Sequence, residues 1–276
     1  MHFVKYLFRV KRQIAMPLLT EQELGGISFA SALMRFLSMD KVNDLYDRYC
    51  GLNGPAFARA VLMDLGVRFE IKNMEVLDSL PDGPFITISN HPYGHIDGII
   101  LVDLFGHLRR DYKVMVNKIL GRIEPLQANF ISVTPVGAER TPPTATSMAG
   151  VRDVLKHVRE GHPIGLFPAG AVSDLSIKER RVRDREWQEP VIRLIKKLDV
   201  PILPVTFNDR NSAFYYTLGL LDWRIRLLRL PSEVFNKRGK TIRVSIGNII
   251  SPEEQEEFND LDDFRQFLRN KVYELK

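Results

Sequence analysis

The segment Asn90–Gly98, which reads Asn-His-Pro-Tyr-Gly-His-Ile-Asp-Gly, contains the residue types needed for acid–base chemistry. A neutral imidazole such as that of His91, held by a nearby carboxylate such as that of Asp97, can act as a general base near pH 7. The same residue types also have structural uses, since Asn, Pro and Gly shape turns and Asp is a common helix N-cap. Taken alone, the segment is compatible with catalysis and with turn geometry.

The flanking residues predict how this segment is positioned. Phe85–Ser89 is apolar and β-branched and follows a Pro-Asp-Gly-Pro turn, so it is predicted to be a strand. Asp97–Leu108 is mostly apolar and is predicted to be a helix. A histidine after the strand and an aspartate at the start of the helix lie at the carboxyl end of a sheet, where open α/β folds bind ligands.

Composition indicates a globular protein from a reducing compartment. The chain has 276 residues, 45% of them hydrophobic and 26% charged, which is ordinary for a protein with a core. The single cysteine, Cys50, excludes an internal disulfide framework. No apolar run approaches the roughly 20 residues that span a bilayer, and charges interrupt the apolar residues of the N-terminus. We therefore expect a protein on the cytosolic side.

Positive charge is concentrated near the end of the chain. The net charge is +5, and residues 222–243 contain seven Lys and Arg residues against two acidic ones. Such a segment suits phospholipid head groups, an acidic carrier protein or nucleic acid. The sequence has no zinc-finger spacing, helix-turn-helix pattern or RNA-binding aromatic motif, so nucleic acid is not an expected partner.

The N-terminal residues are predicted to form a separate helical segment. Residues 1–16 mix apolar and basic side chains, which suits either a membrane interface or a helix packed on the domain, and both remain open. Helices are predicted at Lys41–Tyr49 and Ala56–Leu65. We expect residues 1–66 to form this amphipathic, helical segment and residues 67–276 to form one α/β domain.

Alternating strands and helices follow. The predicted strands are Val67–Ile71, Phe85–Ser89, Tyr112–Val116, Phe130–Val133, Ile164–Phe167, Pro201–Phe207 and Thr241–Ile246. The predicted helices, besides Asp97–Leu108, are Thr146–Glu160, Pro190–Leu198 and a terminal amphipathic helix from Leu261 to Leu275. This alternation predicts the α/β class, with a mostly parallel or mixed sheet flanked by helices.

Three further stretches combine a strand with residues typical of sites. Gly165–Ser173 leads a strand into a Pro/Gly turn, and Asn129–Pro135 ends a strand in small polar groups. Val200–Val205 is an apolar strand with two prolines, which predicts an edge position or a bulge because proline lacks the ladder donor.

In their order along the chain, Asn-His-Pro…Asp-Gly, Phe-Ile-Ser-Val, Phe-Pro-Ala-Gly and Val-Pro-Ile-Leu-Pro-Val resemble the four motifs of the glycerolipid acyltransferase superfamily. Those enzymes move a fatty acyl group from acyl-coenzyme A or acyl-carrier protein onto a lysolipid hydroxyl. The resemblance runs from about Asp82 to Gly247 and implies a glycerol-3-phosphate acyltransferase-like fold. The wording is most similar to the hemolysin-like branch, which includes acyltransferases that make ornithine and glycine lipids.

The resemblance implies roles for individual residues. His91 would be the general base, Asp97 the carboxylate that orients it, and Val200–Val205 would lie near the acyl-donor pocket. The residues expected to bind substrate are Asn90, Gly94, Ser132, Phe167, Pro168, Ala169, Gly170 and Ser173. The resemblance implies no cofactor and no metal, because the acyl-carrier protein or coenzyme A thioester is a co-substrate.

Four departures from the family pattern concern mainly the acceptor. Five residues separate His91 from Asp97, where the widespread motif has four. The resemblance to the hemolysin-like branch implies that this branch shares the five-residue spacing. Ala169 replaces the Glu of Phe-Pro-Glu-Gly, and Val172 stands where an Arg follows. The second motif continues as Ser132-Val-Thr in place of a phosphate-binding Arg. These losses favour a lyso-aminolipid over lysophosphatidic acid as the acceptor.

The expected mechanism is direct acyl transfer, with backbone amides near Gly170 as candidate oxyanion donors. The enzyme is expected to be peripheral, on the cytoplasmic face of the inner membrane. One alternative is a metal-dependent hydrolase using His91, His95 and Asp97, although Tyr93 and Gly98 stand where such a site needs further histidines. The other alternative is a non-catalytic lipid-binding homologue. His95 is expected to shape the turn, and Cys50 is not expected to be a nucleophile.

Overall fold

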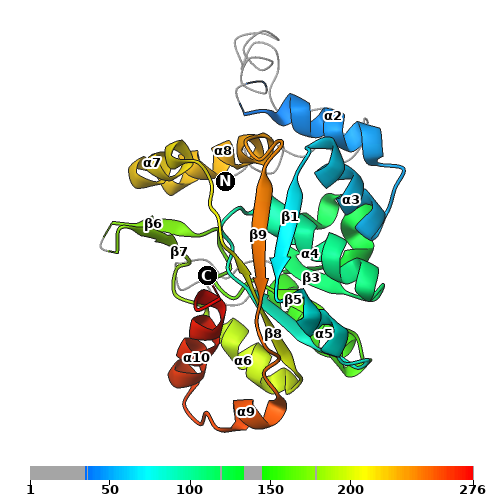
Figure 1. The fold of residues 1–276 in the computed structure, drawn as a ribbon, viewed down its shortest axis with the longest axis vertical. Coiled ribbons are helices and arrows are strands. Elements are labelled where there is room, and N and C mark those ends of the chain that lie inside the picture. Colours follow the sequence, from blue (N-terminus) through cyan, green and yellow to red (C-terminus); the bar gives the residue numbers. More distant parts are fainter. Residues whose placement is uncertain (1–34, 36, 119, 134–144, 178, 276) are drawn as a thin grey trace.

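The computed structural model describes residues 35, 37–118, 120–133, 145–177 and 179–275. Within these residues, seven strands form one mixed sheet flanked by helices, and two more strands form a separate hairpin (Figure 1). The predicted α/β class is therefore confirmed. Residues 1–16, for which a membrane interface or a packed helix was expected, lie outside the described residues.

The main sheet is parallel except at one junction. Its strand order is β1-β9-β8-β2-β5-β3-β4, and the hairpin pairs β6 with β7. The five strands from β8 to β4 are parallel, β8 and β9 are antiparallel, and β9 pairs in parallel with β1. The strands are β1 (Arg68–Lys72), β2 (Ile86–Ser89), β3 (Lys113–Asn117), β4 (Phe130–Val133), β5 (Ile164–Leu166), β6 (Asp174–Ser176), β7 (Arg181–Arg183), β8 (Ile202–Phe207) and β9 (Thr241–Ile246).

Helices connect these strands. The α-helices are α2 (Met39–Tyr49), α3 (Gly54–Asp64), α4 (His95–Leu108), α5 (Ala145–Arg159), α6 (Glu189–Leu198), α7 (Ala213–Leu221), α8 (Trp223–Phe235), α9 (Pro252–Glu256) and α10 (Leu261–Tyr273). Short 3-10 helices are η2 (Met74–Ser79), η3 (Leu120–Arg122) and η4 (Glu124–Asn129). None of the helices in the described ranges is long and apolar enough to cross a membrane.

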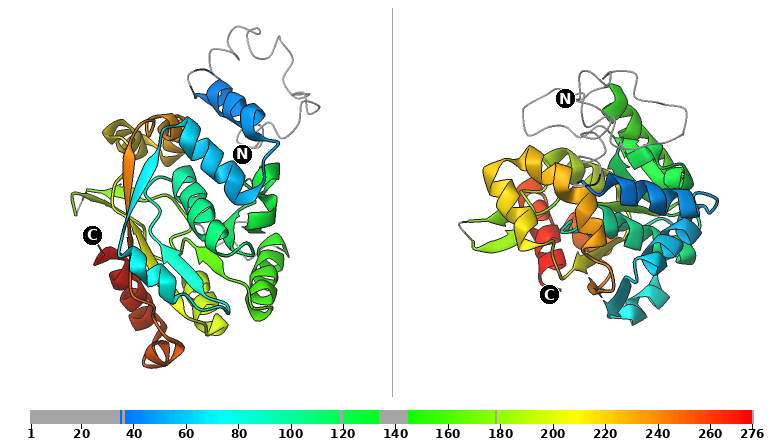
Figure 2. Two further views of the ribbon diagram at one scale, coloured as in Figure 1. Left: turned by 45° about the vertical axis from the view of Figure 1, so that its right-hand side comes forward. Right: turned by 90° about the horizontal axis from the view of Figure 1, so that it is seen from above.

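Two apolar clusters cover the two faces of the sheet. Neighbouring strand residues point to opposite faces, so Phe85 joins one cluster and Ile86 the other. The first cluster includes side chains of α2, α3 and α4, and the second includes side chains of α5, α6 and α10. Figure 2 shows the strands between α3 and α4 on one side and α10 on the other. Helices α2 and α3 thus share an apolar core with the sheet. The domain boundary at residue 66 stays a prediction.

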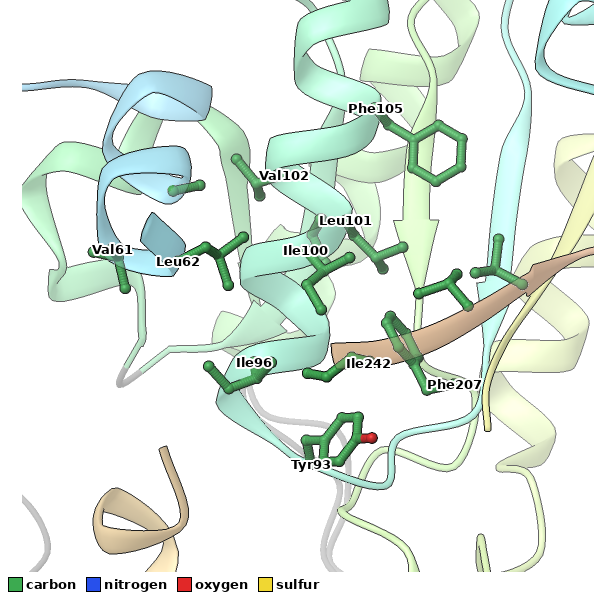
Figure 3. Packing of buried hydrophobic residues seen from close by; sticks show 14 of the residues in the cluster. Val61, Leu62, Tyr93, Ile96, Ile100, Leu101, Val102, Phe105, Phe207 and Ile242 are labelled. Carbon is green, nitrogen blue, oxygen red and sulfur yellow. The ribbon is translucent and has the colours of Figure 1, made fainter. Parts of the chain in front are cut away.

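Helix α4 carries the aspartate of the candidate site. It is apolar on most of its surface, because α3 packs on one side of it and the sheet on the other. Figure 3 shows Val102 beside Leu62 of α3, while Phe105 lies on the side of the sheet. Burying each large apolar side chain contributes roughly 1.5–3 kcal/mol to folding. The buried residues of α4 therefore fix the position of its first turn relative to β2.

Strand β8 occupies the middle of the sheet, so the edge position considered for its two prolines is wrong. Pairing between β8 and β9 is interrupted beside Pro204. Ile202 bridges Ile250 and Val205 pairs with Ile246, which leaves two residues of β8 opposite three of the other chain segment. Pro204 has no backbone N–H to donate to a strand ladder. The one-residue bulge interrupts the ladder at this position, so no donor is needed there.

Candidate active site

His91 and Asp97 are in direct contact. His91 Nδ1 lies 2.7 Å from Asp97 Oδ2, and the Asp97 side chain is fully buried while that of His91 is 17% exposed. His91 is the second residue after the carboxyl end of β2, and Asp97 lies in the first turn of α4. With Nδ1 facing the carboxylate, Nε2 is the nitrogen available to exchange a proton with a ligand.

The turn between them accommodates the five-residue spacing. Gly94 has φ 87° and ψ −89°, and a Cβ at this position would come within 3.1 Å of Leu230 and Val172 side-chain atoms. The amides of Tyr93 and Gly94 donate to Asp97 Oδ2, both at 3.1 Å. Asp97 thus contributes to the capping of α4 and contacts His91 at the same time. The structural use of the segment is confirmed, and the geometry is compatible with catalysis.

Burial shifts the pKa values of two residues at this site, Asp97 and His95. Burial raises the pKa of Asp97, and the interactions with His91 and with the Gly94 and Tyr93 amides oppose that rise. Ionised Asp97 therefore carries a desolvation cost that a positive charge on His91 would offset. Burial, followed by repulsion from His91, lowers the pKa of His95 to about 4. His95 is consequently neutral near pH 7 and adds no second positive charge beside His91.

Asn90 fixes the strand end that presents His91. Its side-chain amide donates to the Phe207 carbonyl at 2.9 Å and accepts from the Phe207 amide at 2.8 Å. The side chain thereby joins the carboxyl ends of β2 and β8, and only 2% of Asn90 is exposed. Expected to bind substrate, Asn90 has a positioning role in this structure.

The Phe167–Gly170 turn lies against His91. The rings of His91 and Phe167 have centroids 4.1 Å apart. The Gly170 amide donates to the Phe167 carbonyl at 2.9 Å, so this amide closes the turn and is engaged before any oxyanion arrives. Gly170 has φ 65°, and a Cβ there would lie 2.2 Å from Gln188 Nε2.

The other two residues of this turn, Pro168 and Ala169, make internal contacts and do not line a cavity at His91. The Pro168 carbonyl accepts from the Gln188 amide at 2.9 Å, and the Ala169 side chain joins the apolar cluster beneath α5, α6 and α10. The Glu of the family motif is thus replaced by a core residue, Ala169.

Ser132, on β4, is partly buried and lies beside Gly121. A Cβ added to Gly121 would meet the Ser132 hydroxyl.

A buried polar network holds the next part of the loop. The Ser173 amide donates to the His91 carbonyl at 2.9 Å, and its hydroxyl donates to Asp184 Oδ1 at 2.5 Å. Asp184 also accepts from the His91 amide at 3.2 Å and from Trp187 Nε1 at 3.2 Å. Ser173, expected to bind substrate, therefore positions the His91 backbone.

Asp184 and Arg226 are site residues that the sequence did not reveal. Asp184 is one of two acids, with Glu179, within the basic run 178–185, which suggested a solvated surface. Arg226 is buried, pairs with Asp174 and donates to the Ser173 carbonyl at 3.2 Å. The detectable signals were an acid within a basic run and one of three arginines spaced among apolar residues in α8, and neither is specific.

An apolar cavity of about 300 Å³ begins at His91 and extends between the helices and the sheet. Of the expected substrate-binding residues, Gly94, Phe167 and Gly170 line it. Its apolar walls come from α2, α3, β3, η4, β4, α6 and α8, including Leu45, Val61, Val116, Leu126, Phe130, Val191 and Val234. A long apolar chain placed here would end beside the imidazole.

The metal alternative gains no support from this arrangement. In the part of the chain that the structure describes, no group of three or more His, Cys, Asp or Glu side chains is arranged to hold a metal ion. His95 lies in the cavity wall, whereas Cys50 is exposed at the end of α2 and is not among the residues that line the cavity.

Comparisons with known proteins agree with the resemblance seen in the motifs. The model of a family described as "Acyltransferase" matches residues 10–276. A lyso-glycine lipid O-acyltransferase of Phocaeicola vulgatus is 27% identical over 257 residues, covering 89% of this chain and 86% of the relative. A lyso-glycine lipid O-acyltransferase of Bacteroides thetaiotaomicron is 26% identical over 256 residues, covering 89% of each protein.

One solved structure is also similar, the 1-acyl-sn-glycerophosphate acyltransferase PlsC of Thermotoga maritima. It covers 88% of this chain and 91% of its own, with 13% sequence identity and a TM-score of 0.47.

Proposed function

Because the chain belongs to the acyltransferase family, its chemistry is acyl transfer, and we propose that it moves a fatty acyl group from a thioester to the hydroxyl of a lysolipid. The observation that carries this proposal is the position of His91. Its imidazole contacts the buried Asp97 carboxylate and lies in the wall of an apolar cavity. A general base beside an acyl-sized apolar cavity fits an alcohol attacking a fatty thioester.

In the proposed reaction, His91 Nε2 takes the proton of the acceptor hydroxyl while the oxygen attacks the thioester carbonyl carbon. The tetrahedral intermediate then expels the thiol, which receives the proton from His91. Asp97 holds the ring and stabilises the imidazolium, as in a catalytic triad without the protein nucleophile. The donor is acyl-carrier protein or coenzyme A thioester, and no other cofactor takes part.

The proposed acceptor is a lyso-aminolipid, with 1-acylglycerol-3-phosphate as the second candidate. The names of the two curated relatives support the first choice. The replacement of an acid by Ala169, which packs in the core, also supports an acceptor pocket different from that of the widespread motif. We propose that the enzyme works as a peripheral protein on the cytoplasmic face of the inner membrane.

The test is a matrix of donors and acceptors. The purified full chain is incubated with acyl-carrier protein or coenzyme A thioesters and with lyso-glycine lipid, lyso-ornithine lipid or lysophosphatidic acid, and the products are identified by mass spectrometry. We expect a diacylated aminolipid. His91→Ala should lower kcat by about 10²–10⁴-fold.

A second His–Asp pair on the same helix provides the control. His107 Nδ1 lies 3.2 Å from Asp103 Oδ1, outside the cavity, so His107→Ala should leave kcat unchanged. Unchanged turnover in His91→Ala would disprove the assignment of the base. Lysolipid binding without product from any donor would instead favour the lipid-binding homologue.

A further inference from the structure

Helices α7 and α8 carry an exposed apolar surface that the proposed reaction does not use. Figure 1 places both helices together at one end of the molecule, beside the β6–β7 hairpin. Within residues 214–227 the exposed large apolar side chains are Phe214, Leu220, Leu221, Trp223, Ile225 and Leu227, here called the α7–α8 patch. Leu221 is 78% exposed and Trp223 is 51% exposed.

The sequence of α7 explains why both of its sides are apolar. Ala213–Leu221 contains no charged residue. Tyr215 and Tyr216 face the protein and are buried, so Phe214, Leu220 and Leu221 remain outside. A helix that is apolar on both sides is typical of one covered by a further apolar phase.

The charges around the patch favour an anionic lipid surface as that phase. Residues 222–243 contain seven basic and two acidic residues. Arg226 and Lys237 are buried in ion pairs, so the other five basic residues carry the charge near the patch. The Arg229 guanidinium lies 5.6 Å from the Phe214 ring centroid, so a cation is part of the patch itself. Two copies meeting through this surface would bring the same basic segments together, whereas anionic head groups would neutralise them.

Helix α8 contributes residues both to the patch and to the wall of the cavity. Trp223, Ile225 and Leu227 occupy the first half of this helix, whereas Pro231 and Val234 in its second half line the apolar cavity. The same helix therefore reaches from the exposed patch to the apolar cavity that begins at His91. A lipid chain leaving a bilayer at the patch would therefore meet apolar surface towards the cavity.

We propose that the α7–α8 patch is the surface with which the enzyme docks on an anionic bilayer, resting on the proposed lysolipid substrate. Trp223 and Phe214 lie at the head-group level, as amphipathic aromatic rings do, and Leu221 inserts among the acyl chains. Docking in this orientation brings the membrane to the helix that borders the cavity.

The full chain should bind vesicles of equal parts phosphatidylglycerol and phosphatidylcholine in a flotation assay, and bind pure phosphatidylcholine vesicles more weakly. Leu221→Glu and Trp223→Glu should each weaken binding by at least about tenfold, because each replaces an inserted apolar group with an anion. Met63→Glu is the matched control, since Met63 is 71% exposed on α3, outside the patch, and its substitution should leave binding unchanged.

A second measurement needs no variant. The chain has two tryptophans, and Trp187 is 1% exposed, so lipids brominated on their acyl chains should quench Trp223 selectively. Absence of vesicle binding, absence of quenching, or equal binding by the patch variants would overturn the proposal. A patch variant that abolishes a dimer in sedimentation without changing vesicle binding would also overturn it and identify a second copy as the occupant.

The assay separates the two proposals. Vesicle binding needs no turnover, so His91→Ala should bind as tightly as the unmodified protein. Normal docking without acyl transfer in any donor–acceptor pair would disprove the proposed function alone. Turnover of detergent-dispersed lysolipid without docking would disprove the membrane surface alone.

Discussion

At the scale of single residues, Asp97 serves two purposes through two sets of contacts. Its carboxylate accepts the Tyr93 and Gly94 amides, which begins α4, and it contacts His91 Nδ1. A helix cap is rigid, so the carboxylate that orients the imidazole is held by the backbone. Substitutions that keep the cap and remove the charge can therefore separate structure from catalysis.

Asp97→Asn should lower kcat by about 10²–10⁴-fold with little loss of stability. The Asn oxygen in the place of Oδ2 can still accept the Tyr93 and Gly94 amides and face His91 Nδ1. It carries no negative charge, so the imidazolium formed during proton transfer loses its electrostatic partner. Steady-state kinetics and thermal unfolding test this, with Asp97→Ala expected to lose both activity and stability. A fully active Asp97→Asn enzyme would contradict the role given to the carboxylate.

His95 should make the protein less stable in mild acid. Burial lowers its folded-state pKa from 6.5 to about 4. Between these values the unfolded chain binds a proton that the folded chain does not, so the free energy of unfolding falls as the pH falls from about 6.5 towards 4. The contribution is complete above 6.5, and the slope from one such group is at most about 1.4 kcal/mol per pH unit.

Urea unfolding of the full chain and of His95→Gln between pH 7 and 5 tests this expectation. The variant should show a shallower fall, keeping the part due to His157, whose pKa burial also lowers. Identical slopes in the two proteins would show that His95 is not shielded as the structure indicates.

At the scale of elements, the site is assembled from segments that meet only in the folded sheet. Asn90 joins β2 to β8, and the Ser173–Asp184 network joins the loop after β5 to the His91 backbone. Arg226 of α8 then holds that loop through Asp174 and the Ser173 carbonyl. The geometry of His91 thus depends on a helix far along the chain.

Arg226→Met should lower kcat several-fold and destabilise the protein by about 1–3 kcal/mol, because Asp174 and a buried carbonyl lose their partner. Arg185→Met is the matched control. Arg185 pairs with the same aspartate, but its side chain is 47% exposed, so its loss should cost no more than about 1 kcal/mol. Kinetics and urea unfolding of both variants are compared. Equal effects would refute the view that Arg226 positions the loop.

The cavity wall should set the preferred acyl length. Val61 of α3 lines the cavity, and Val61→Phe would fill part of its volume. The ratio of kcat/KM for long to short saturated acyl donors should fall at least about tenfold. Leu62→Phe adds bulk in the same helix outside the cavity, so it should affect stability without changing this ratio. An unchanged ratio in Val61→Phe would show that the chain binds elsewhere.

At the scale of the whole molecule, hydrophobic periodicity predicted the seven strands of the main sheet because each is a short segment that is either apolar throughout or alternates apolar and polar residues. The same reasoning missed the β6–β7 hairpin and helices α7 and α8. The strands of the hairpin are three residues each, and Pro231 lies inside α8. Local patterns left β8 open between an edge position and a bulge, because they do not show which strands pair with it. The structure contains the bulge, beside Pro204.

The sequence predicted which motif residues would meet at the candidate site. It did not predict which residues hold them in position. His91, Asp97, Gly94, Phe167 and Gly170 meet at one place, as their motifs predicted. Residues identified by family wording alone, such as Asn90 and Ser173, make internal contacts in the structure. A sequence motif records that a residue is needed near the site, but burial and hydrogen bonding decide whether it touches a ligand or holds the frame.

The pairing of β1 with β9 has a consequence for synthesis. These strands are parallel neighbours, although roughly 170 residues separate them in the chain. At the usual rates of translation, β1 leaves the ribosome on the order of 10–30 s before its partner. For that interval the nascent chain carries an unpaired strand, a template for pairing with another chain. Ribosome-bound chains that stop before Thr241 should therefore depend on chaperones that complete chains do not need.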